Sequence, residues 1–448
     1  MQQKTHRSTG SDTRAATPPR RSLLTLALCV AGLGTATSAH AFEWGNFSLT
    51  GFAKATVSRA SNGCDNCQRE PDASRQFIWA DDIVFGREFG ALTSDSWQIQ
   101  PVIGAKLDLP QGFKASATYS QRYRDGRADL PGVVYERSAT LKHEYYGSLT
   151  IGNFPSRAWN RSDFPYASDI GQTAFSDSGA AYGILTKAVR YTSRELFVAD
   201  GNLVLEATYD QGDTDFKRNK PALYELWALW GRGPLVVEAV AQSGKNGPAG
   251  SFAKAGFTGL TPFPQRDDKQ LGGNRQSSFL VLGKYQIGTA YEVSGGLRFN
   301  RWSGAYAVQL TQGAQAQWNN PFNVNWNGFD ANGVPNPGYS ARSTDMMLGL
   351  RKYVNPKVVA YSGLTYLGKA STANPSERGQ SNTALFATLG GRYTIGDGLS
   401  VSASVNGVWY GRKGLAPLSM PAHNAFSNID SRIAQRGNWL AAEVNYRF

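Results

Sequence analysis

The chain has 448 residues, a formal net charge of +12 and a mean hydropathy of −0.38. A helical membrane protein needs apolar runs of about 20 residues, and the only long apolar run here lies near the amino terminus. The basic residues form no dense stripe and no nucleic-acid-binding motif, so DNA or RNA is not the expected partner.

The first segment, residues 1–41, has the pattern of a secretory signal peptide. Arg20 and Arg21 precede an apolar run over residues 22–33, and residues 39–41 (AHA) form a small-residue cleavage site. We expect cleavage after Ala41, which leaves the mature chain as residues 42–448. The alternative, a membrane anchor, is disfavoured because the apolar run is too short to span a bilayer comfortably.

Two cysteines remain after the signal peptide, Cys64 and Cys67. An even pair in an exported protein favours a disulfide. Free thiols and a metal or redox role are the alternatives. A structural zinc site needs four ligands, and no other cysteine or histidine lies close by in the sequence.

From residue 46 onward, most segments alternate between apolar and polar residues, the pattern of a strand with one apolar face. Turn residues separate pairs of such segments. The expected strands are residues 46–58, 97–109, 113–124, 134–145, 148–154, 187–194, 202–211, 222–230, 235–242, 277–286, 290–303, 342–352, 357–369, 383–394, 399–410 and 438–448. Residues 76–89 are either a further strand element or part of the first loop. In residues 222–230 both faces carry large apolar side chains.

The last strand has the clearest alternation. Phe448, Tyr446, Val444, Ala442 and Leu440 alternate with polar or small residues, which suits a strand with lipid on one face and water on the other. The connections along the chain alternate between short and long, as in a transmembrane barrel with short periplasmic turns and long outer loops. A soluble β-sandwich or propeller is the alternative, and the chain shows no repeated blade motif. The expected fold is all-β, a transmembrane antiparallel β-barrel of about 16 strands.

Four short motifs resemble the trimeric general porins of Gram-negative outer membranes, especially the β-proteobacterial type. They are residues 49–53 (LTGFA), 147–153 (GSLTIGN), 188–191 (AVRY) and 445–448 (NYRF). The resemblance implies an outer-membrane barrel in lipid, a homotrimer, and a third loop, about residues 154–186, that folds inward as the pore constriction. In that family acidic loop residues face basic residues on the barrel wall. The candidate loop residues are Arg157, Arg161, Asp163, Asp169 and Asp177.

The positions of pore-facing parity carry twelve basic and nine acidic residues, which predicts a hydrated channel with a weak anion preference. The basic ones are Lys54, Lys106, Lys114, Arg122, Arg124, Lys142, Arg190, Lys284, Arg298, Arg351, Arg392 and Arg447, and the acidic ones are Asp108, Glu136, Glu144, Glu206, Asp210, Glu238, Glu292, Asp345 and Glu443. Lys114, Arg122, Arg190 and Arg392 are the candidates for the basic pore wall. The alternative is that most of these charges pair across strands and only solvate the wall.

The expected function is passive diffusion of ions and small hydrophilic solutes. A substrate-specific channel for a sugar or a carboxylate is the alternative, and residues 318–327, with tryptophans and amides, could stack on a sugar. A surface adhesin is a further alternative. An enzyme is not expected, because the mature chain has only His143 and His423 as catalytic bases and no serine motif near either. No catalytic residue, cofactor or metal site is predicted.

Overall fold

The computed structural model describes residues 42–60, 93–124, 133–176, 178–211, 222–245, 274–304, 331, 338–373, 383–412, 417, 419 and 436–448. Several predictions fall outside these residues. They are the signal peptide (residues 1–41), the disulfide between Cys64 and Cys67, the constriction residue Asp177, the segments 76–89 and 318–327, and His423.

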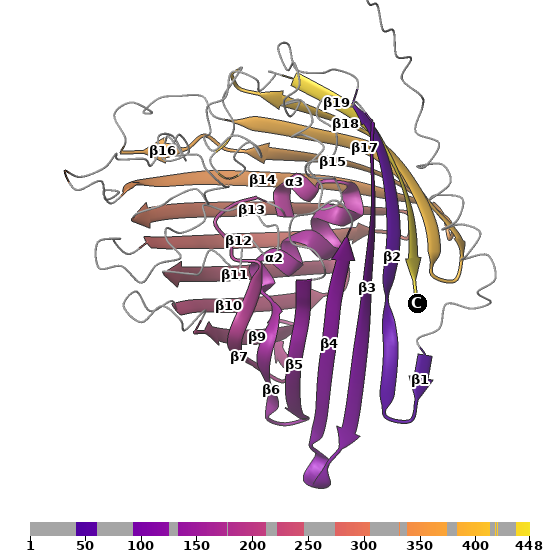
Figure 1. Cartoon of the computed structure of the whole chain (residues 1–448), viewed down its shortest axis with the longest axis vertical. Helices are drawn as coiled ribbons and strands as arrows, with labels where there is room; N and C mark the ends of the chain where they lie inside the picture. Colours follow the sequence, from indigo (N-terminus) through magenta and orange to yellow (C-terminus); the bar gives the residue numbers. More distant parts are fainter. Residues whose placement is uncertain are drawn as a thin grey trace, which may run out of the picture. The chain divides into compact units, whose positions relative to one another are not determined.

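Sixteen long antiparallel strands form one closed barrel (Figure 1). They are β2 (Phe47–Ala60), β3 (Thr93–Asp108), β4 (Lys114–Arg124), β5 (Val133–His143), β6 (Gly147–Pro155), β7 (Ile184–Thr192), β9 (Gly201–Asp210), β10 (Ala222–Arg232), β11 (Leu235–Lys245), β12 (Asn274–Ile287), β13 (Tyr291–Gly304), β14 (Gly338–Asn355), β15 (Val358–Leu367), β17 (Ala384–Gly396), β18 (Leu399–Tyr410) and β19 (Arg436–Arg447). The predicted fold class and strand number are confirmed.

Three short strands extend the sheet and were not expected from the sequence. They are β1 (Phe42–Trp44), which pairs with β2, β8 (Leu196–Val198), which pairs with β9, and β16 (Ser371–Thr372), which pairs with β14. Each has only two or three residues, too few for a period-two pattern to be visible in the sequence.

The ring closes where β19 pairs with β2, from Trp439 opposite Ala60 to Arg447 opposite Phe52. The backbone N–H of Gly51 donates to the carbonyl of Phe448 at 2.8 Å, and the N–H of Phe448 donates back at 3.0 Å. The terminal aromatic residue therefore belongs to the seam of the barrel, which leaves no open sheet edge there.

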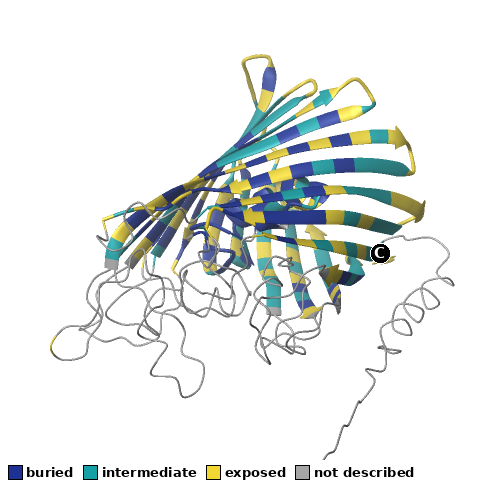
Figure 2. Cartoon of the chain, turned by 90° about the horizontal axis from the view of Figure 1, so that it is seen from above, coloured by how far each residue is buried: buried dark blue, intermediate teal, exposed yellow. Residues whose placement is uncertain are grey.

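Buried and exposed residues alternate along the strands (Figure 2). Residues 341–351 of β14 switch strictly between buried and exposed, with Met346, Leu348 and Leu350 exposed and Asp345 and Arg351 buried. In a soluble protein the buried face is apolar. Here large apolar side chains cover the outside, and most buried strand residues are polar, the arrangement that a lipid-facing barrel requires.

The structure resolves the ambiguous strand β10. Tyr224 and Leu226 point outward, with 61% and 60% of their surface exposed, whereas Leu223, Glu225 and Trp227 are buried on the inner side. Both faces are apolar because the inner face of β10 does not line water. It packs against another part of the chain.

That part is the connection between β6 and β7, which we call the inner loop (residues 156–183). It contains α2 (Arg157–Arg161), η3 (Ser162–Ala167), η4 (Ser168–Ile170) and α3 (Thr173–Ser176), and Figure 1 shows these helices inside the ring of strands. None of the helices in the described part of the chain is long and apolar enough to cross a membrane.

Candidate pore constriction

The inner loop is pinned where it leaves and re-enters the barrel wall. The N–H of Ser156 donates to the carbonyl of Gly183 at 2.8 Å, and its hydroxyl donates to the carbonyl of Tyr182 at 2.5 Å. The same hydroxyl accepts from the N–H of Trp159 at 3.1 Å and so caps α2. One serine thus joins the two ends of the loop and starts its first helix.

The inner loop covers one side of the barrel, strands β9–β15, which we call the packed wall. Tyr166, Ile170 and Phe175 of the loop are fully buried against Leu280 and Leu282 of β12 and their neighbours. Burying a side chain of this size contributes about 1.5–3 kcal/mol. An apolar core therefore lies inside a barrel whose other inner surfaces are polar.

Glycines in the packed wall make room for the loop. A Cβ on Gly349 of β14 would lie 2.4 Å from Ile170 Cδ1, and one on Gly363 of β15 would lie 2.5 Å from Gln172 Cγ. Glycine inside a strand often marks such a close approach. These inward-facing glycines were the sequence signal that could have located the loop contact.

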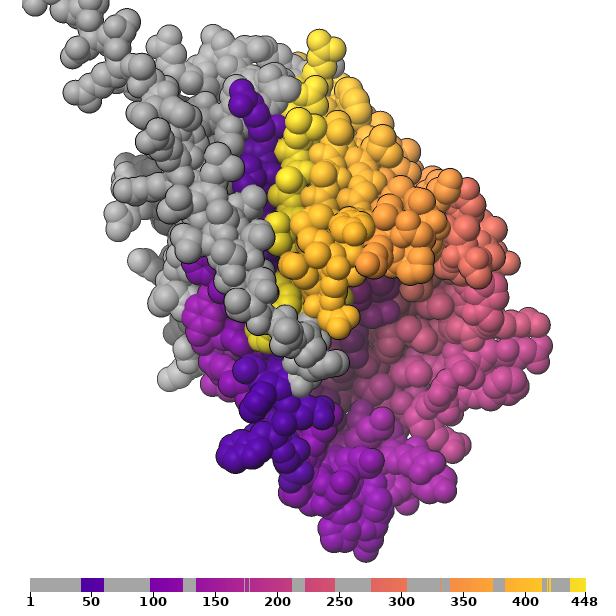
Figure 3. All heavy atoms as spheres, turned by 90° about the vertical axis from the view of Figure 1, so that its right-hand side faces the viewer, coloured from indigo at the N-terminus to yellow at the C-terminus, as the bar shows by residue number. Residues whose placement is uncertain are grey.

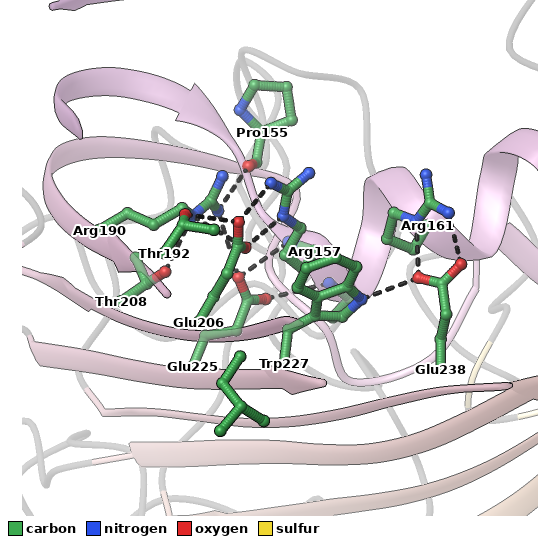
Figure 4. A network of polar contacts seen from close by, with 12 residues as sticks. Pro155, Arg157, Arg161, Arg190, Thr192, Glu206, Thr208, Glu225, Trp227 and Glu238 are labelled. Carbon is green, nitrogen blue, oxygen red and sulfur yellow. Dashed lines mark hydrogen bonds and ion pairs between the residues drawn. The ribbon is translucent and has the colours of Figure 1, made fainter. Parts of the chain in front are cut away.

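Buried glutamates on three adjacent strands hold the first half of the loop (Figure 4). They are Glu206 of β9, Glu225 of β10 and Glu238 of β11, with side chains at most 2% exposed. Arg157 donates to the two carboxylate oxygens of Glu206 at 2.5 and 2.7 Å. Arg161 makes the same bidentate contact with the two carboxylate oxygens of Glu238. Such bidentate pairs fix geometry as well as adding energy.

Glu225 acts on the backbone of α2. Its two oxygens accept from the N–H groups of Arg157 at 2.8 Å and Ala158 at 3.0 Å, the donors that a helix start leaves without partners. Burial alone would lower the pKa of Arg157, but the carboxylates of Glu206, Glu225 and Glu238 outweigh burial and raise it. The guanidinium is therefore held in its charged form.

Aromatic groups complete this contact. The indole Nε1 of Trp227 donates to Glu238 at 2.8 Å, and the guanidinium of Arg157 lies 4.9 Å from the centre of the same ring. The hydroxyl of Tyr166 lies 3.3 Å from Glu238. Burial, together with the nearby carboxylate of Glu238, raises the pKa of Tyr166, so this phenol stays a neutral donor.

Arg190 of β7 lies behind the loop's first turn. It donates to Thr208 Oγ1 at 3.0 Å and to the carbonyl of Pro155 at 3.1 Å, and its Nη2 lies 3.4 Å from Glu225 (Figure 4). Only 8% of its side chain is exposed. This predicted wall residue supports the loop from behind.

Further ion pairs hold the second half of the loop. Asp169 accepts from Arg351 of β14 at 2.6 Å and from Arg392 of β17 at 3.4 Å. Arg298 of β13 donates to the carbonyl of Phe175 at 2.5 Å and pairs with Asp345 at 2.7 Å. The sequence marked Arg298, Arg351 and Asp345 as facing inward, but nothing in it indicated which of them meets the loop.

Opposite the packed wall, between the inner loop and strands β2–β5 and β17–β19, lies an open cavity of about 550 Å³. We call these strands the open wall. Figure 3 shows the surface hollowed between the orange strands near the carboxyl terminus and the magenta strands. The charged residues that line the cavity are Lys54, Arg122, Arg392, Arg447, Asp163, Asp169 and Glu443.

The cations of the open wall are held by polar and aromatic neighbours. Arg122 donates to Gln100 Oε1 at 2.7 Å and lies 4.4 Å from the centre of the Tyr135 ring. Arg447 lies 5.5 Å from the Phe164 ring of the inner loop. Cation–π contacts of this kind orient a guanidinium while leaving its charge in place.

The structure separates the predicted site residues into groups. Asp163, Asp169, Arg122 and Arg392 line the cavity, whereas Arg157, Arg161 and Arg190 lie against the packed wall. Lys114 stands apart, because it begins β4 beside the turn η2 (Pro110–Gly112) and pairs with exposed Asp108 at 3.9 Å.

The sequence missed the role of the wall glutamates. Glu206 and Glu238 were recognised as facing inward, and Glu225 was not, because the parity of β10 was ambiguous. The signal available was an acidic residue at inward parity on each of β9, β10 and β11, opposite a loop with Arg157 and Arg161.

His143 is the one histidine among the described residues, and it lies at an exposed turn. Its Nε2 is 3.1 Å from the carbonyl oxygen of Gln111, and its ring lies 4.6 Å from those of Phe113 and Tyr146. Packing with neighbouring aromatic rings accounts for its position.

No protein-family model matches the sequence, and no curated protein matches it. Solved structures do match. The chain is similar to the anion-selective porin from Comamonas acidovorans, with a TM-score of 0.58 and 10% identity over 90% of this chain and 99% of that one. It has the porin fold. OmpF of Salmonella typhi matches with a TM-score of 0.56 and 11% identity, over 91% of this chain and 100% of that one. The trimer form of OmpT, an outer-membrane protein of Vibrio cholerae, matches with a TM-score of 0.53 and 13% identity, over 90% of this chain and 99% of that one.

Proposed function

We propose that the protein is an outer-membrane porin that lets ions and small hydrophilic solutes diffuse through a water-filled pore. The observation that carries this proposal is the cavity of about 550 Å³ between the inner loop and the open wall. The barrel is apolar outside and polar inside, and the loop fills only the side of the packed wall. A polar passage along the open wall therefore remains beside the constriction.

A weak anion preference follows from the charges on this passage. Four cations and three acids line it, and Asp169 is shared by Arg351 and Arg392. Lys54 and Glu443 lie 3.9 Å apart and offset each other. Two positive charges, Arg122 and Arg447, therefore remain against one negative charge, Asp163. The carboxylate of Asp163 also accepts hydrogen bonds from the hydroxyls of Ser168 and Ser176. Charged groups placed in this way set the sign of selectivity in a pore.

The test is the single-channel current of the purified, refolded protein in a planar bilayer under a salt gradient. Large ohmic steps with a reversal potential of anion sign are expected. A cation-sign potential would contradict the anion preference alone, and a correctly folded barrel without conductance would contradict the channel.

A substrate-specific channel is the second candidate, because aromatic side chains also line the cavity, among them Tyr135, Phe164 and Trp439. Aromatic faces stack on sugar rings. Saturable current that a sugar or carboxylate blocks would favour this alternative over general diffusion.

We further propose a homotrimer, supported by the similarity in fold to the trimer form of Vibrio cholerae OmpT. Conductance steps in groups of three, and the mass of the detergent-solubilised assembly, test this.

Amino-terminal sequencing of the mature protein tests the proposed cleavage after Ala41, for which Phe42 should come first. Its intact mass with and without reductant tests the proposed disulfide between Cys64 and Cys67.

A further inference from the structure

One row of side chains on the open wall carries an aromatic ring among polar groups. Phe52 of β2 has the same inward parity as Lys54, and both line the cavity. The direct cross-strand partners of Phe52 are Arg447 of β19 and Gln100 of β3. A hydrated pore does not require an apolar ring on its wall, so the ring at this position calls for a reason of its own.

A second ring faces the same row from the inner loop. Phe164 precedes Pro165, and the residue before a proline is disfavoured in the helical conformation. Phe164 accordingly leaves the helical backbone of η3, with φ −123° and ψ 130°, and its side chain is 45% exposed at the cavity. The guanidinium of Arg447 lies 5.5 Å from the centre of this ring. Arg447 therefore adjoins two rings, Phe52 on the wall and Phe164 on the loop.

The charge of Arg447 is not offset by a neighbouring acid. Two other cations of the cavity are paired, Lys54 with Glu443 and Arg392 with Asp169. Within the described ranges the side chain of Arg447 has no carboxylate partner. A guanidinium offers donors only, and its planar fork matches a carboxylate in a bidentate contact. The ligand that suits this position is therefore an anion.

The polar neighbours in the row are already engaged. Gln100 Nε2 donates to Ser120 Oγ at 3.0 Å, and Gln100 Oε1 accepts from Arg122 Nε at 2.7 Å. A sugar would need acceptors for its hydroxyl protons beside the rings, and this amide oxygen is taken. A cationic ligand would need a carboxylate, and the row of Arg447, Phe52, Gln100 and Arg122 has none. Two ring faces and one guanidinium are what the row presents to a solute.

We propose that this row is a subsite for aromatic carboxylates. The ring of the solute lies between Phe52 and Phe164, and its carboxylate binds the guanidinium of Arg447. The inference rests on the proposed pore function and deepens it by naming a class of solute. Paired rings attract each other beyond the area they bury, and charge-assisted hydrogen bonds hold the carboxylate. An aliphatic carboxylate uses the cation alone and a neutral aromatic uses the rings alone, so a solute with both groups binds more tightly than either.

The first measurement is the block of chloride current through the full-length mature barrel in a planar bilayer. The probes are benzoate, acetate and benzamide, each added over the same range of concentrations. Benzoate should reduce the current saturably, and its half-blocking concentration should be at least tenfold below those of acetate and benzamide. Equal half-blocking concentrations for benzoate and acetate would overturn the proposal.

The charge is tested with Arg447→Gln. This variant should raise the half-blocking concentration of benzoate about tenfold, because the charge-assisted contact is lost. Arg232→Gln is the matched control, since Arg232 ends β10 at an exposed position and pairs with Asp200 at 3.3 Å. The control should be blocked like the parent. Parent-like block of Arg447→Gln, or an equal change in the control, would overturn the proposal.

The rings are tested with Phe52→Leu, which keeps an apolar side chain and removes the ring face. The half-blocking concentration of benzoate should rise about threefold, while that of acetate stays unchanged. A mere change in pore width would shift both anions together and would count against the subsite. Phe279→Leu is the control, because Phe279 is also 45% exposed but lies on the outer face of the barrel. If Phe52→Leu does not fold, Phe164→Leu on the inner loop decides by the same criteria.

A binding measurement that needs no conductance separates the subsite from the pore. Fluorine NMR of para-fluorobenzoate with the detergent-solubilised barrel should show line broadening that benzoate reverses and acetate does not. A barrel that broadens the line in this way without conducting overturns the channel alone. A conducting barrel whose broadening is absent, or is reversed equally by acetate, overturns the subsite alone.

Discussion

The packed wall and the open wall use the same charged residue types for opposite purposes. On the packed wall, Glu206 and Glu238 are almost fully buried, and each forms an ion pair with an arginine of the inner loop. On the open wall, Lys54 and Glu443 keep 19% and 28% of their side chains exposed at 3.9 Å from each other. The difference lies in the loop, which removes water from one side only. Charges covered by the loop hold structure, and charges beside the cavity remain in contact with water.

The largest effect should come from the most deeply buried pair. Asp345→Ala leaves the guanidinium of Arg298, 2% exposed, without its carboxylate, and should lower the free energy of unfolding by about 3–5 kcal/mol. Urea unfolding in lipid vesicles measures this. Asp108→Ala is the control, because Asp108 is 88% exposed in its pair with Lys114 and should show almost no change. Similar losses of stability in both variants would contradict the distinction between buried charges that stabilise the fold and exposed charges that do not.

A smaller loss is expected where the arginine is partly exposed. Glu206→Gln removes one charge of the pair with Arg157, whose side chain is 27% exposed, and should cost about 2–3 kcal/mol. The loop should also loosen, which would increase open-channel noise. Glu443→Gln on the open wall provides the comparison and should leave the noise unchanged. A quiet channel in the Glu206 variant would show that this carboxylate does not hold the loop.

Overpacking the contact between the inner loop and the packed wall should lower the free energy of unfolding by less than the two charge changes do. Gly349→Leu places a side chain where Ile170 lies, and overpacking of this kind typically costs about 1–3 kcal/mol. It should also push the loop toward the open wall and reduce conductance. Gly283→Leu is the control, because the nearest atom to a Cβ there is 3.7 Å away. Equal conductance in the two variants would place the loop elsewhere.

The last prediction concerns the sign of selectivity rather than stability. Arg122→Glu reverses one charge on the open wall and should shift the reversal potential under a salt gradient toward cation sign. Lys114→Glu reverses a charge of the same kind beside the turn η2, outside the cavity lining, and should leave the potential near that of the parent. If Lys114→Glu shifts the potential as far as Arg122→Glu does, the cavity does not set the selectivity.

The sequence predicted the barrel because alternation is local. The alternation of each strand is visible within about ten residues. Met346, Leu348 and Leu350, for example, identify the outer face of β14 without any information from the rest of the chain. Strand β10 was ambiguous for a physical reason, since its inner face packs against the loop at Trp227 while its outer face meets lipid at Tyr224.

The candidate site was less accessible from sequence because its contacts join distant segments. Asp169 and Arg351 are 182 residues apart and Arg157 and Glu206 are 49 apart. Parity indicates that a charge faces inward, but it does not say whether the loop or water lies in front of it. Arg190 and Arg122 have the same parity and type, and only the course of the inner loop places one behind it and the other on the cavity.

The seam between β19 and β2 has a consequence for biogenesis. The side chains of Thr56 and Glu443, which are 387 positions apart in the chain, meet across it at 3.5 Å, and the backbone of Phe448 bonds to Gly51. Pairings of such long range form slowly, since the chain entropy of bringing the ends together is lost before the contacts stabilise them. Until then the first and last long strands are unpaired edges with apolar faces, prone to aggregate. The polypeptide therefore has to be kept from self-association until its final residues reach the site of assembly.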